Sequence, residues 1–326
     1  MGQYTPTYHP ELLAEHAVAY RQSRFIADEA CPVSGTDSKL VKYYKYTRAD
    51  ANRITDDEMS PDGMPNQRKF SKTSVEVEVA PHGLFDRLPI TDLTGSNDGG
   101  DLEMDTVEDL TDDILLNREK RVADLLMTPA NYGSANKVTL STPWTNQTSS
   151  TPIQTIQTGQ RACALPPNIM VMDRVTWDAF RIHPDILDRL GGPTRKAGMA
   201  QRDQVAEMFE LEKVLIGEVR YNSANPGATE AYSYIWPQGR VLLAHQPQTP
   251  RKKQLMLART YRLNQTNNGG ADAEGARPGE RRGGFLVTQV VEEQRGTAGT
   301  LFIKVAHEEK SVHVATDAGY LISSAA

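Results

Sequence analysis

The longest hydrophobic pattern in the chain lies between residues 105 and 127. Apolar side chains recur there on one helical stripe, formed by Val107, Leu110, Ile114, Val122 and Leu125. Asp105 stands in the N-cap position and Glu108 follows three residues later, the spacing of a capping box. The sequence therefore predicts a long helix over 105–127, about 33 Å in length at a rise of 1.5 Å per residue.

A hairpin with a long polar tip is predicted before this helix. Residues 74–79 alternate strictly between polar residues and valine, and residues 40–46 form an apolar and aromatic run, so both segments predict strands. Residues 47–72 between them are charged and carry almost no large apolar side chain. A hairpin of this kind cannot bury itself, so we expect residues 39–79 to form either a disordered loop or an arm that lies on another molecule.

Shorter elements are predicted in the rest of the chain. Helices are expected at 10–30, 176–190 and 202–210. Strands are expected at 166–172, 213–217, 240–244, 254–261, 285–293, 300–307 and 311–315, with tight turns between the last three. The polar segment 134–159 and the glycine-rich segment 264–284 are expected to be linkers. These elements together predict a protein of the α+β class.

The composition is lean for a compact enzyme of 326 residues. Only 38% of the residues are hydrophobic and the mean hydropathy is -0.52, which suits a chain that is extended or completed by neighbouring molecules. The net charge of -6 disfavours general nucleic-acid binding, because phosphate contacts need a basic surface. Cys31 and Cys163 lie far apart, so we expect reduced thiols, neither a disulfide nor a thiolate zinc site, and a reducing cytoplasm.

The sequence contains no catalytic or targeting motif that we could identify. It has no nucleophile elbow, P-loop or zinc-protease motif, and its seven histidines are scattered, so neither a metal site nor a cofactor is expected. No apolar run is long enough to span a membrane, and no secretory signal is expected. A hydrolase that uses His183 and nearby acids remains the alternative from another functional class.

Four stretches, taken in order, carry a resemblance to a known family. They are Gly83–Ile90, Leu165–Met172 followed by Trp177 and His183–Ile186, Lys213–Gly217 followed by Ile235-Trp236, and Gly319–Ile322. In this order the chain resembles the major capsid proteins of tailed bacteriophages, whose fold is shared by encapsulin shells. The resemblance covers nearly the whole chain, and its specificity comes from the order of elements, because these coats share no short fixed signature.

The resemblance implies a division of the chain. The expected parts are an N-terminal arm at 1–38, an extended hairpin loop at 39–80, a peripheral domain at 81–160 with its spine helix at 105–127, an inserted axial domain at 161–263, and a linker with the return to the peripheral sheet at 264–326. Only about forty residues precede the first strand. A scaffolding protein is therefore expected to be a separate chain.

The resemblance also implies a function. The chain is expected to assemble into pentamers and hexamers of an icosahedral shell that encloses double-stranded DNA, first in the host cytoplasm and finally in the virion. A portal and a decoration protein are further expected partners, and no membrane is involved. The encapsulin-type compartment, which has the same fold but holds cargo protein, is the nearest alternative.

The tip of the extended loop is the predicted contact between subunits. Its acidic patch comprises Asp56, Asp57 and Glu58, and its basic patch comprises Arg68, Lys69 and Lys72. Each patch needs partners of opposite sign, which neighbouring copies of the chain could provide. The alternative interpretation is a loop of solvated charges that contacts nothing.

Overall fold

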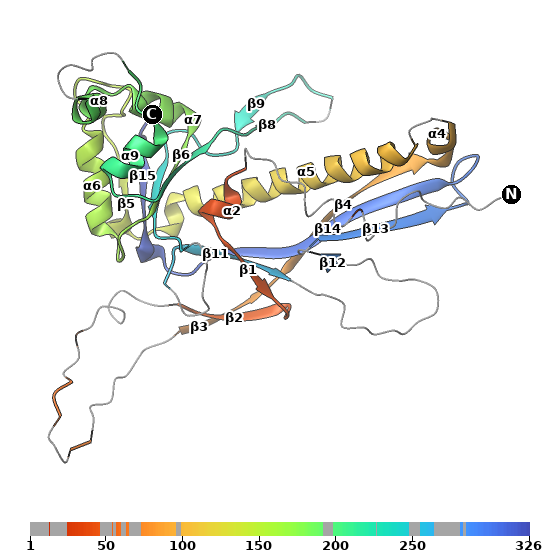
Figure 1. Ribbon diagram of the computed structural model, residues 1–326, viewed down its shortest axis with the longest axis horizontal. Coiled ribbons are helices and arrows are strands. Elements are labelled where there is room, and N and C mark those ends of the chain that lie inside the picture. The colour runs from red at the N-terminus through yellow and green to blue at the C-terminus, as the bar shows by residue number, and fades with distance from the viewer. Residues whose placement is uncertain are drawn as a thin grey trace.

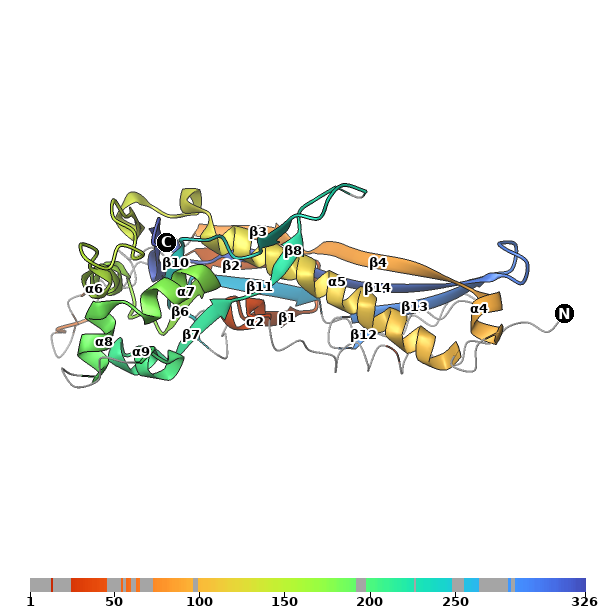
Figure 2. The same ribbon diagram turned by 90° about the horizontal axis from the view of Figure 1, so that it is seen from above.

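The molecule is elongated, with a long helix lying along one sheet and a second unit of helices and strands at one end (Figures 1 and 2). The computed structural model describes residues 13, 25–45, 54, 57–59, 63–64, 73–95, 99–191, 198–225, 227–247, 255–263, 281–282 and 285–326. Mixed helices and strands confirm the predicted α+β class. Among the described residues, no helix combines the length and apolar character needed to cross a membrane.

The first sheet has six strands, and its longest strand continues through a predicted turn. The order is β1 (Val33–Thr36), β11 (Ala258–Leu263), β14 (Thr300–His313), β13 (Phe285–Glu292) and β12 (Arg281–Arg282), and β4 (Ala80–Pro89) also pairs with β14. The separate strands expected at 300–307 and 311–315 are wrong, because both belong to β14. Buried positions alternate along it without a break through Glu309, so the chain has no reason to turn there.

The spine helix, α5, spans Gly99–Met127 and follows the short helix α4 (Ile90–Gly95). It begins six residues before the predicted start, so Asp105 is an exposed residue inside the helix and the predicted capping box is wrong. The apolar stripe starts earlier than expected because Leu102 also packs against the six-stranded sheet. The sequence analysis placed the start of the helix too late because residues 99 and 100 are glycines, and glycine is a poor helix former.

The spine helix contributes to two different cores. Val107, Leu110 and Ile114 pack on the six-stranded sheet with residues such as Ile303. Val122 packs instead with strands of the second unit, and Leu125 is half-buried beside it. One helix therefore joins the two halves of the molecule.

The second unit is built on a five-stranded sheet. Its order is β5 (Lys137–Thr139), β15 (Gly319–Ser323), β10 (Val241–Ala244), β6 (Ile169–Asp173) and β7 (Lys213–Gly217). Around it lie α6 (Pro152–Ala162), α7 (Arg174–Arg181), α8 (Pro184–Gly191) and α9 (Arg202–Met208), with short 3-10 turns at Pro129–Asn131, Ser134–Asn136 and Thr316–Ala318. A two-stranded hairpin, β8 (Arg220–Asn222) and β9 (Tyr232–Tyr234), projects from this unit (Figure 1).

Strand membership differs from the residue ranges expected for the two domains. β11 lies within 161–263 but pairs with β14 of the six-stranded sheet, whereas β5 and β15 lie outside that range and belong to the five-stranded sheet. Local periodicity predicts that a segment is a strand, but hydrogen bonding to a distant partner decides which sheet it joins.

The segment 134–159 is not the linker that its composition suggested. It contains β5 and most of α6, which starts with Pro152 in the first turn, a position that proline favours. The helix buries Ile156 and Gly159 on its inner face. Gly159 lies so close to the sheet that a Cβ atom would stand 2.7 Å from a ring carbon of Tyr320, so the contact depends on a residue without a side chain.

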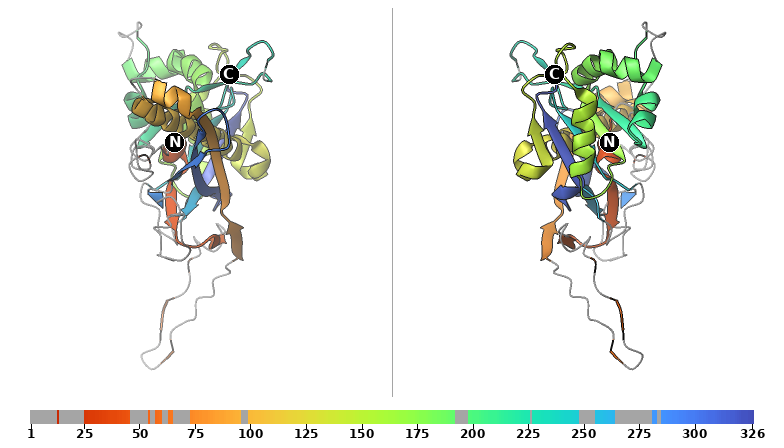
Figure 3. Two further views of the ribbon diagram at one scale, coloured as in Figure 1. Left: turned by 90° about the vertical axis from the view of Figure 1, so that its right-hand side faces the viewer. Right: turned by 90° about the vertical axis from the view of Figure 1, so that its left-hand side faces the viewer.

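The hairpin before the spine is anchored at its base on its own subunit. β2 (Leu40–Lys45) pairs antiparallel with β3 (Thr73–Glu78), as the sequence predicts, and the pair extends away from the body (Figures 1 and 3). Contrary to expectation, one face of this strand pair is buried against the six-stranded sheet, where Tyr43 packs with Tyr261 and Val312. The Tyr43 hydroxyl also donates to the carbonyl of His313 over 3.3 Å.

The helix expected at 10–30 is described only in part. Phe25 and Ile26 are not helical, and α2 covers only Ala27–Ala30. Pro32 follows, so the chain leaves this turn at once for β1. Apart from Leu13, which is buried, the rest of the predicted helix lies outside the described residues.

Candidate functional site

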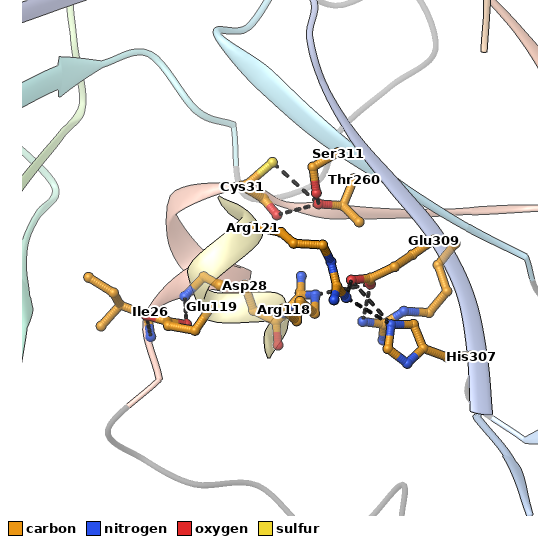
Figure 4. Close-up of polar contacts among 12 residues, drawn as sticks. Ile26, Asp28, Cys31, Arg118, Glu119, Arg121, Thr260, His307, Glu309 and Ser311 are labelled. Carbon is orange, nitrogen blue, oxygen red and sulfur yellow. Dashed lines mark hydrogen bonds and ion pairs between the residues drawn. The ribbon is translucent and has the colours of Figure 1, made fainter. Parts of the chain in front are cut away.

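A partly buried cluster of charges lies where the spine helix meets the first sheet and the turn that contains α2 (Figure 4). We call it the charged junction and define it as Asp28, Arg118, Glu119, Arg121, Arg262, His307 and Glu309. The helix α5 supplies three of these residues, β14 supplies two, and β11 and α2 supply one each. The junction therefore ties together segments that lie far apart in the sequence.

Glu309 is the centre of the charged junction. Its buried carboxylate accepts hydrogen bonds from Arg118 Nε at 3.0 Å, Arg121 Nη2 at 3.1 Å and Arg262 Nη2 at 3.0 Å. Burial alone would raise the pKa of Glu309, but the hydrogen bond from His307 and the arginine charges outweigh it and hold the pKa well below its usual range. Glu309 is therefore a carboxylate whenever the protein is folded near neutral pH.

His307 takes part as a neutral donor. Burial lowers the pKa of this imidazole, more than the neighbouring carboxylate raises it, so the ring is uncharged at pH 7. Its Nε2 lies 3.3 Å from Glu309 Oε1, which can only accept, and 3.4 Å from Arg121 Nη2, which can only donate. We assign the ring proton to Nε2 because Glu309 is the nearer partner, so Nε2 does not accept a hydrogen bond from Arg121. This assignment leaves the arginines as the positive charges that face Glu309.

The neighbouring residue Glu119 fastens the turn before β1 to the spine. It is fully buried, and its Oε1 accepts from the backbone N–H of Ile26 at 3.1 Å and from Trp236 Nε1 at 2.7 Å. Its Oε2 accepts from the N–H of Ala27 at 2.9 Å. Arg118 adds an ion pair with Asp28 at 2.8 Å, so two consecutive spine residues clasp α2.

The polar contacts of the charged junction hold α5, β14, β11 and α2 together. Cys31, Thr260 and Ser311 lie beside the junction (Figure 4), but burial raises the pKa of the Cys31 thiol to about 11. The acidic groups of the junction are paired with arginines or backbone donors. In the described part of the chain, no group of three histidine, cysteine or acidic side chains could hold a metal ion. Breaking one partner of such a buried ion network is strongly destabilising, because it leaves charge unpaired.

His183, the residue of the hydrolase alternative, does make a pair with a serine. Its Nε2 lies 2.9 Å from Ser150 Oγ, and its Nδ1 accepts from the backbone N–H of Asp185 at 3.2 Å. Burial lowers the pKa of His183, so the ring is neutral and its single proton is on Nε2. The ring therefore donates to Ser150, which in turn donates to the carbonyl of Asn146 at 2.6 Å.

That proton direction is opposite to the one a nucleophile needs. In a catalytic serine–histidine pair the ring accepts the hydroxyl proton and a carboxylate holds the other ring nitrogen. In this protein Nδ1 accepts a hydrogen bond from the backbone N–H of Asp185 in the first turn of α8, so His183 caps that helix. This geometry gives Ser150 no general base.

The predicted contact residues of the loop tip lie mostly outside the described part of the chain. Asp57 and Glu58 are described and exposed, whereas Asp56, Arg68, Lys69 and Lys72 lie outside the described residues. The tip also presents apolar side chains that the sequence analysis did not weigh. Ile54 is 98% exposed, Met64 is 94% exposed and Met59 is also exposed.

The sequence analysis missed the charged junction, although two signals were available. His307 and Glu309 occupy consecutive buried positions of an otherwise apolar alternation in β14. Arg118 and Arg121 lie three residues apart, and so on one face of a helix, where they are near enough to share a partner. Polar groups at core positions need partners, so these residues together point to a buried ion network.

The fold is similar to that of several solved phage-related and encapsulin structures. A crystal structure of a phage-related protein from Bordetella bronchiseptica RB50 superposes with a TM-score of 0.71 at 21% identity, covering 99% of this chain and 98% of that one. The encapsulin complex from Synechococcus elongatus PCC 7942 gives a TM-score of 0.53 at 11% identity, covering 93% of this chain and 88% of that one. The class defined by the fold is thus the one that phage capsids and encapsulins share.

Sequence similarity identifies the family within that class. The family model described as phage major capsid protein E matches residues 129–271. The major capsid protein of Pseudomonas phage JBD67 is 33% identical over 228 residues, covering 70% of this chain and 74% of that one. The chain belongs to the phage major capsid protein family, as the resemblance predicted.

Proposed function

We propose that copies of this chain associate as pentamers and hexamers and close into an icosahedral shell around double-stranded DNA. Membership of the phage major capsid protein family supports this. The observation that carries the proposal is the hairpin: Tyr43 anchors its base in a core, whereas Ile54 and Met64 of its tip are exposed to solvent. Such a projecting segment suits contact with another copy.

Contacts made by the loop tip would be individually weak. The acidic patch Asp56–Glu58 and the basic patch Arg68–Lys72 would each pair with opposite charges on neighbouring copies. An exposed ion pair contributes only about 0.2–1 kcal/mol. Many such contacts reinforce one another when a shell closes, and each remains weak enough to be corrected during assembly.

The same proposal covers the remaining partners and the place of assembly. We infer a purely structural role without catalysis, a separate scaffolding protein, a portal, and a decoration protein on the mature head. Cys31 and Cys163 are buried thiols, which suits assembly in the reducing host cytoplasm. A net charge of -6 would let packaged DNA move along the inner wall without attachment.

Reversal of two basic tip residues tests the proposal. We expect the double variant Arg68→Glu with Lys69→Glu to fold normally but to form fewer shells, most visibly at low salt, where repulsion is least screened. Sedimentation at two salt concentrations measures assembly, and circular dichroism measures folding. The matched control, Arg68→Lys with Lys69→Arg, keeps both charges and should assemble normally.

Two results would count against the proposal. Normal shells from the charge-reversed variant at both salt concentrations would show that these residues are not assembly contacts. Cargo protein instead of DNA inside particles purified from infected cells would favour the encapsulin-type alternative.

A further inference from the structure

Two histidines face each other across neighbouring strands beside the charged junction. His82 on β4 is the direct register partner of His307 on β14, and their ring centroids lie 5.5 Å apart. His307 is buried, whereas His82 is half-buried and lines a cavity of about 420 Å³ between α5, β4 and β14. Solvent protons can therefore reach the histidine pair through this cavity.

The charges around the histidine pair balance at neutral pH. The three arginines of the charged junction are matched by its three carboxylates, and the cavity is lined by Arg121 and Lys310 against Asp124 and Glu309. Both of these carboxylates already have a cation partner, because Glu309 accepts from Arg121 at 3.1 Å and Asp124 pairs with Lys120. A proton bound by either histidine would add a positive charge that no carboxylate of the described residues around the pair is left to match.

The surroundings of the pair therefore favour neutral rings. His307 also faces the guanidinium of Arg262 on β11 and, at 5.4 Å between centroids, the apolar ring of Phe285 on β13. Burial lowers the pKa of both histidines and the charge of Arg121 lowers it further, while Glu309 acts in the opposite direction. Closing β4 over β14 thus excludes protons that free histidines would bind at mildly acidic pH.

The start of β4 is also weakly attached to the sheet. Pro81 has no backbone N–H to donate to a neighbouring strand, and Gly83 has no side chain that could pack. The buried apolar side chain of β4 is that of Leu88, near the other end of the strand. Because β3 ends at Glu78, the weak start of β4 is the place where the extended hairpin joins the six-stranded sheet.

We propose that His82 and His307 form a pH-sensitive contact, whose protonation at acidic pH releases the first residues of β4 from β14 while the rest of the molecule stays folded. In the released form the rings have the ordinary histidine pKa of about 6.5. Each histidine that binds its proton only in the released form should raise the opening equilibrium constant by up to about tenfold for each pH unit below that value. Repulsion between the two charged rings then opposes reclosing.

Hydrogen exchange of the unassembled full-length chain, measured by mass spectrometry between pH 7.5 and 5.0 and corrected for the intrinsic pH dependence of exchange, tests the proposal. Protection at residues 82–85 should fall by up to about tenfold per pH unit for each histidine, while protection of β7 at Lys213–Gly217 stays constant. His82→Gln cannot take up the proton and should reduce the slope of this fall by about half. The matched control, His245→Gln, removes a histidine of the second unit and should keep the parental slope.

Three results would overturn the proposal. Protection at residues 82–85 that does not change with pH would show that no release occurs. A parental slope in His82→Gln would show that the histidine pair does not control the release, and this variant should fold because His82 is only half-buried. An equal loss of protection in β4 and β7 would show that acid unfolds the whole chain instead of releasing one strand.

Discussion

Replacement of Glu119 by alanine tests how the turn at α2 is held to the spine. The substitution removes the acceptor of three buried donors: the N–H groups of Ile26 and Ala27 and the indole N–H of Trp236. A buried donor without a partner costs about 1–3 kcal/mol. Water can enter the space left by the side chain, so each donor should cost an amount in the lower part of that range. For the three donors together, we expect the free energy of unfolding to fall by about 3–5 kcal/mol.

Two further variants separate hydrogen bonding from charge. Glu119→Gln keeps one carbonyl oxygen for Ile26 and Trp236 but places an amide group toward the N–H of Ala27, so it should lose about 1–3 kcal/mol. Lys120→Ala removes only the exposed pair with Asp124 on the same helix and should lose less than about 0.5 kcal/mol.

Urea unfolding of the unassembled chain, followed by circular dichroism, gives the free energies for this series. Hydrogen exchange at the Ile26 and Ala27 amides provides a local measurement, and exchange there should become faster in Glu119→Ala. A Glu119→Ala protein as stable as Lys120→Ala, with unchanged exchange, would refute the assigned role of Glu119.

Three other variants examine packing and pH dependence. Ile114→Asp should prevent folding, because the charge would be buried unpaired on the six-stranded sheet, and soluble, shell-forming protein would contradict this. Gly159→Ala should lose about 1–3 kcal/mol in urea unfolding through overpacking against Tyr320, whereas Gly133→Ala, with open space around it, should be neutral. Burial lowers the pKa of His307 in the folded protein below its value of about 6.5 in the unfolded chain. The neutral ring therefore stabilises the folded state above a pH of about 6.5, and this stabilisation is lost as the pH falls. The urea midpoint should therefore drop less between pH 7.5 and 5.5 in His307→Gln than in the parent, and an equal drop would count against this.

Strong local periodicity was the most reliable guide to the fold. The strand at Lys213–Gly217 has the bounds that its apolar run predicts, and the spine helix ends at Met127 as expected. The helix α6 was missed because most of its side chains are polar and its contact with the sheet depends on a glycine. Apolar periodicity is a weak signal where a small residue makes the closest approach.

The charged junction could not be derived from any one segment. Glu309 is held by residues of α5 and β11 that lie 191, 188 and 47 positions away in the sequence. A single buried glutamate in a strand indicates that partners exist but not where they are. Only the pairing of β14 with β11 and the crossing of α5 bring the three arginines to one carboxylate.

The place of β15 within the five-stranded sheet affects when the protein can finish folding during its synthesis. β10 ends at Ala244 and its neighbour β15 begins at Gly319, so the ribosome must add a long stretch of chain before that sheet can close. At rates of about 5–20 residues per second, the interval is roughly 4–15 s. For that time Leu242 and Leu243, buried in the finished sheet, lack their strand partner on one side. A copy whose synthesis stops before β15 lacks this strand and cannot complete the five-stranded sheet.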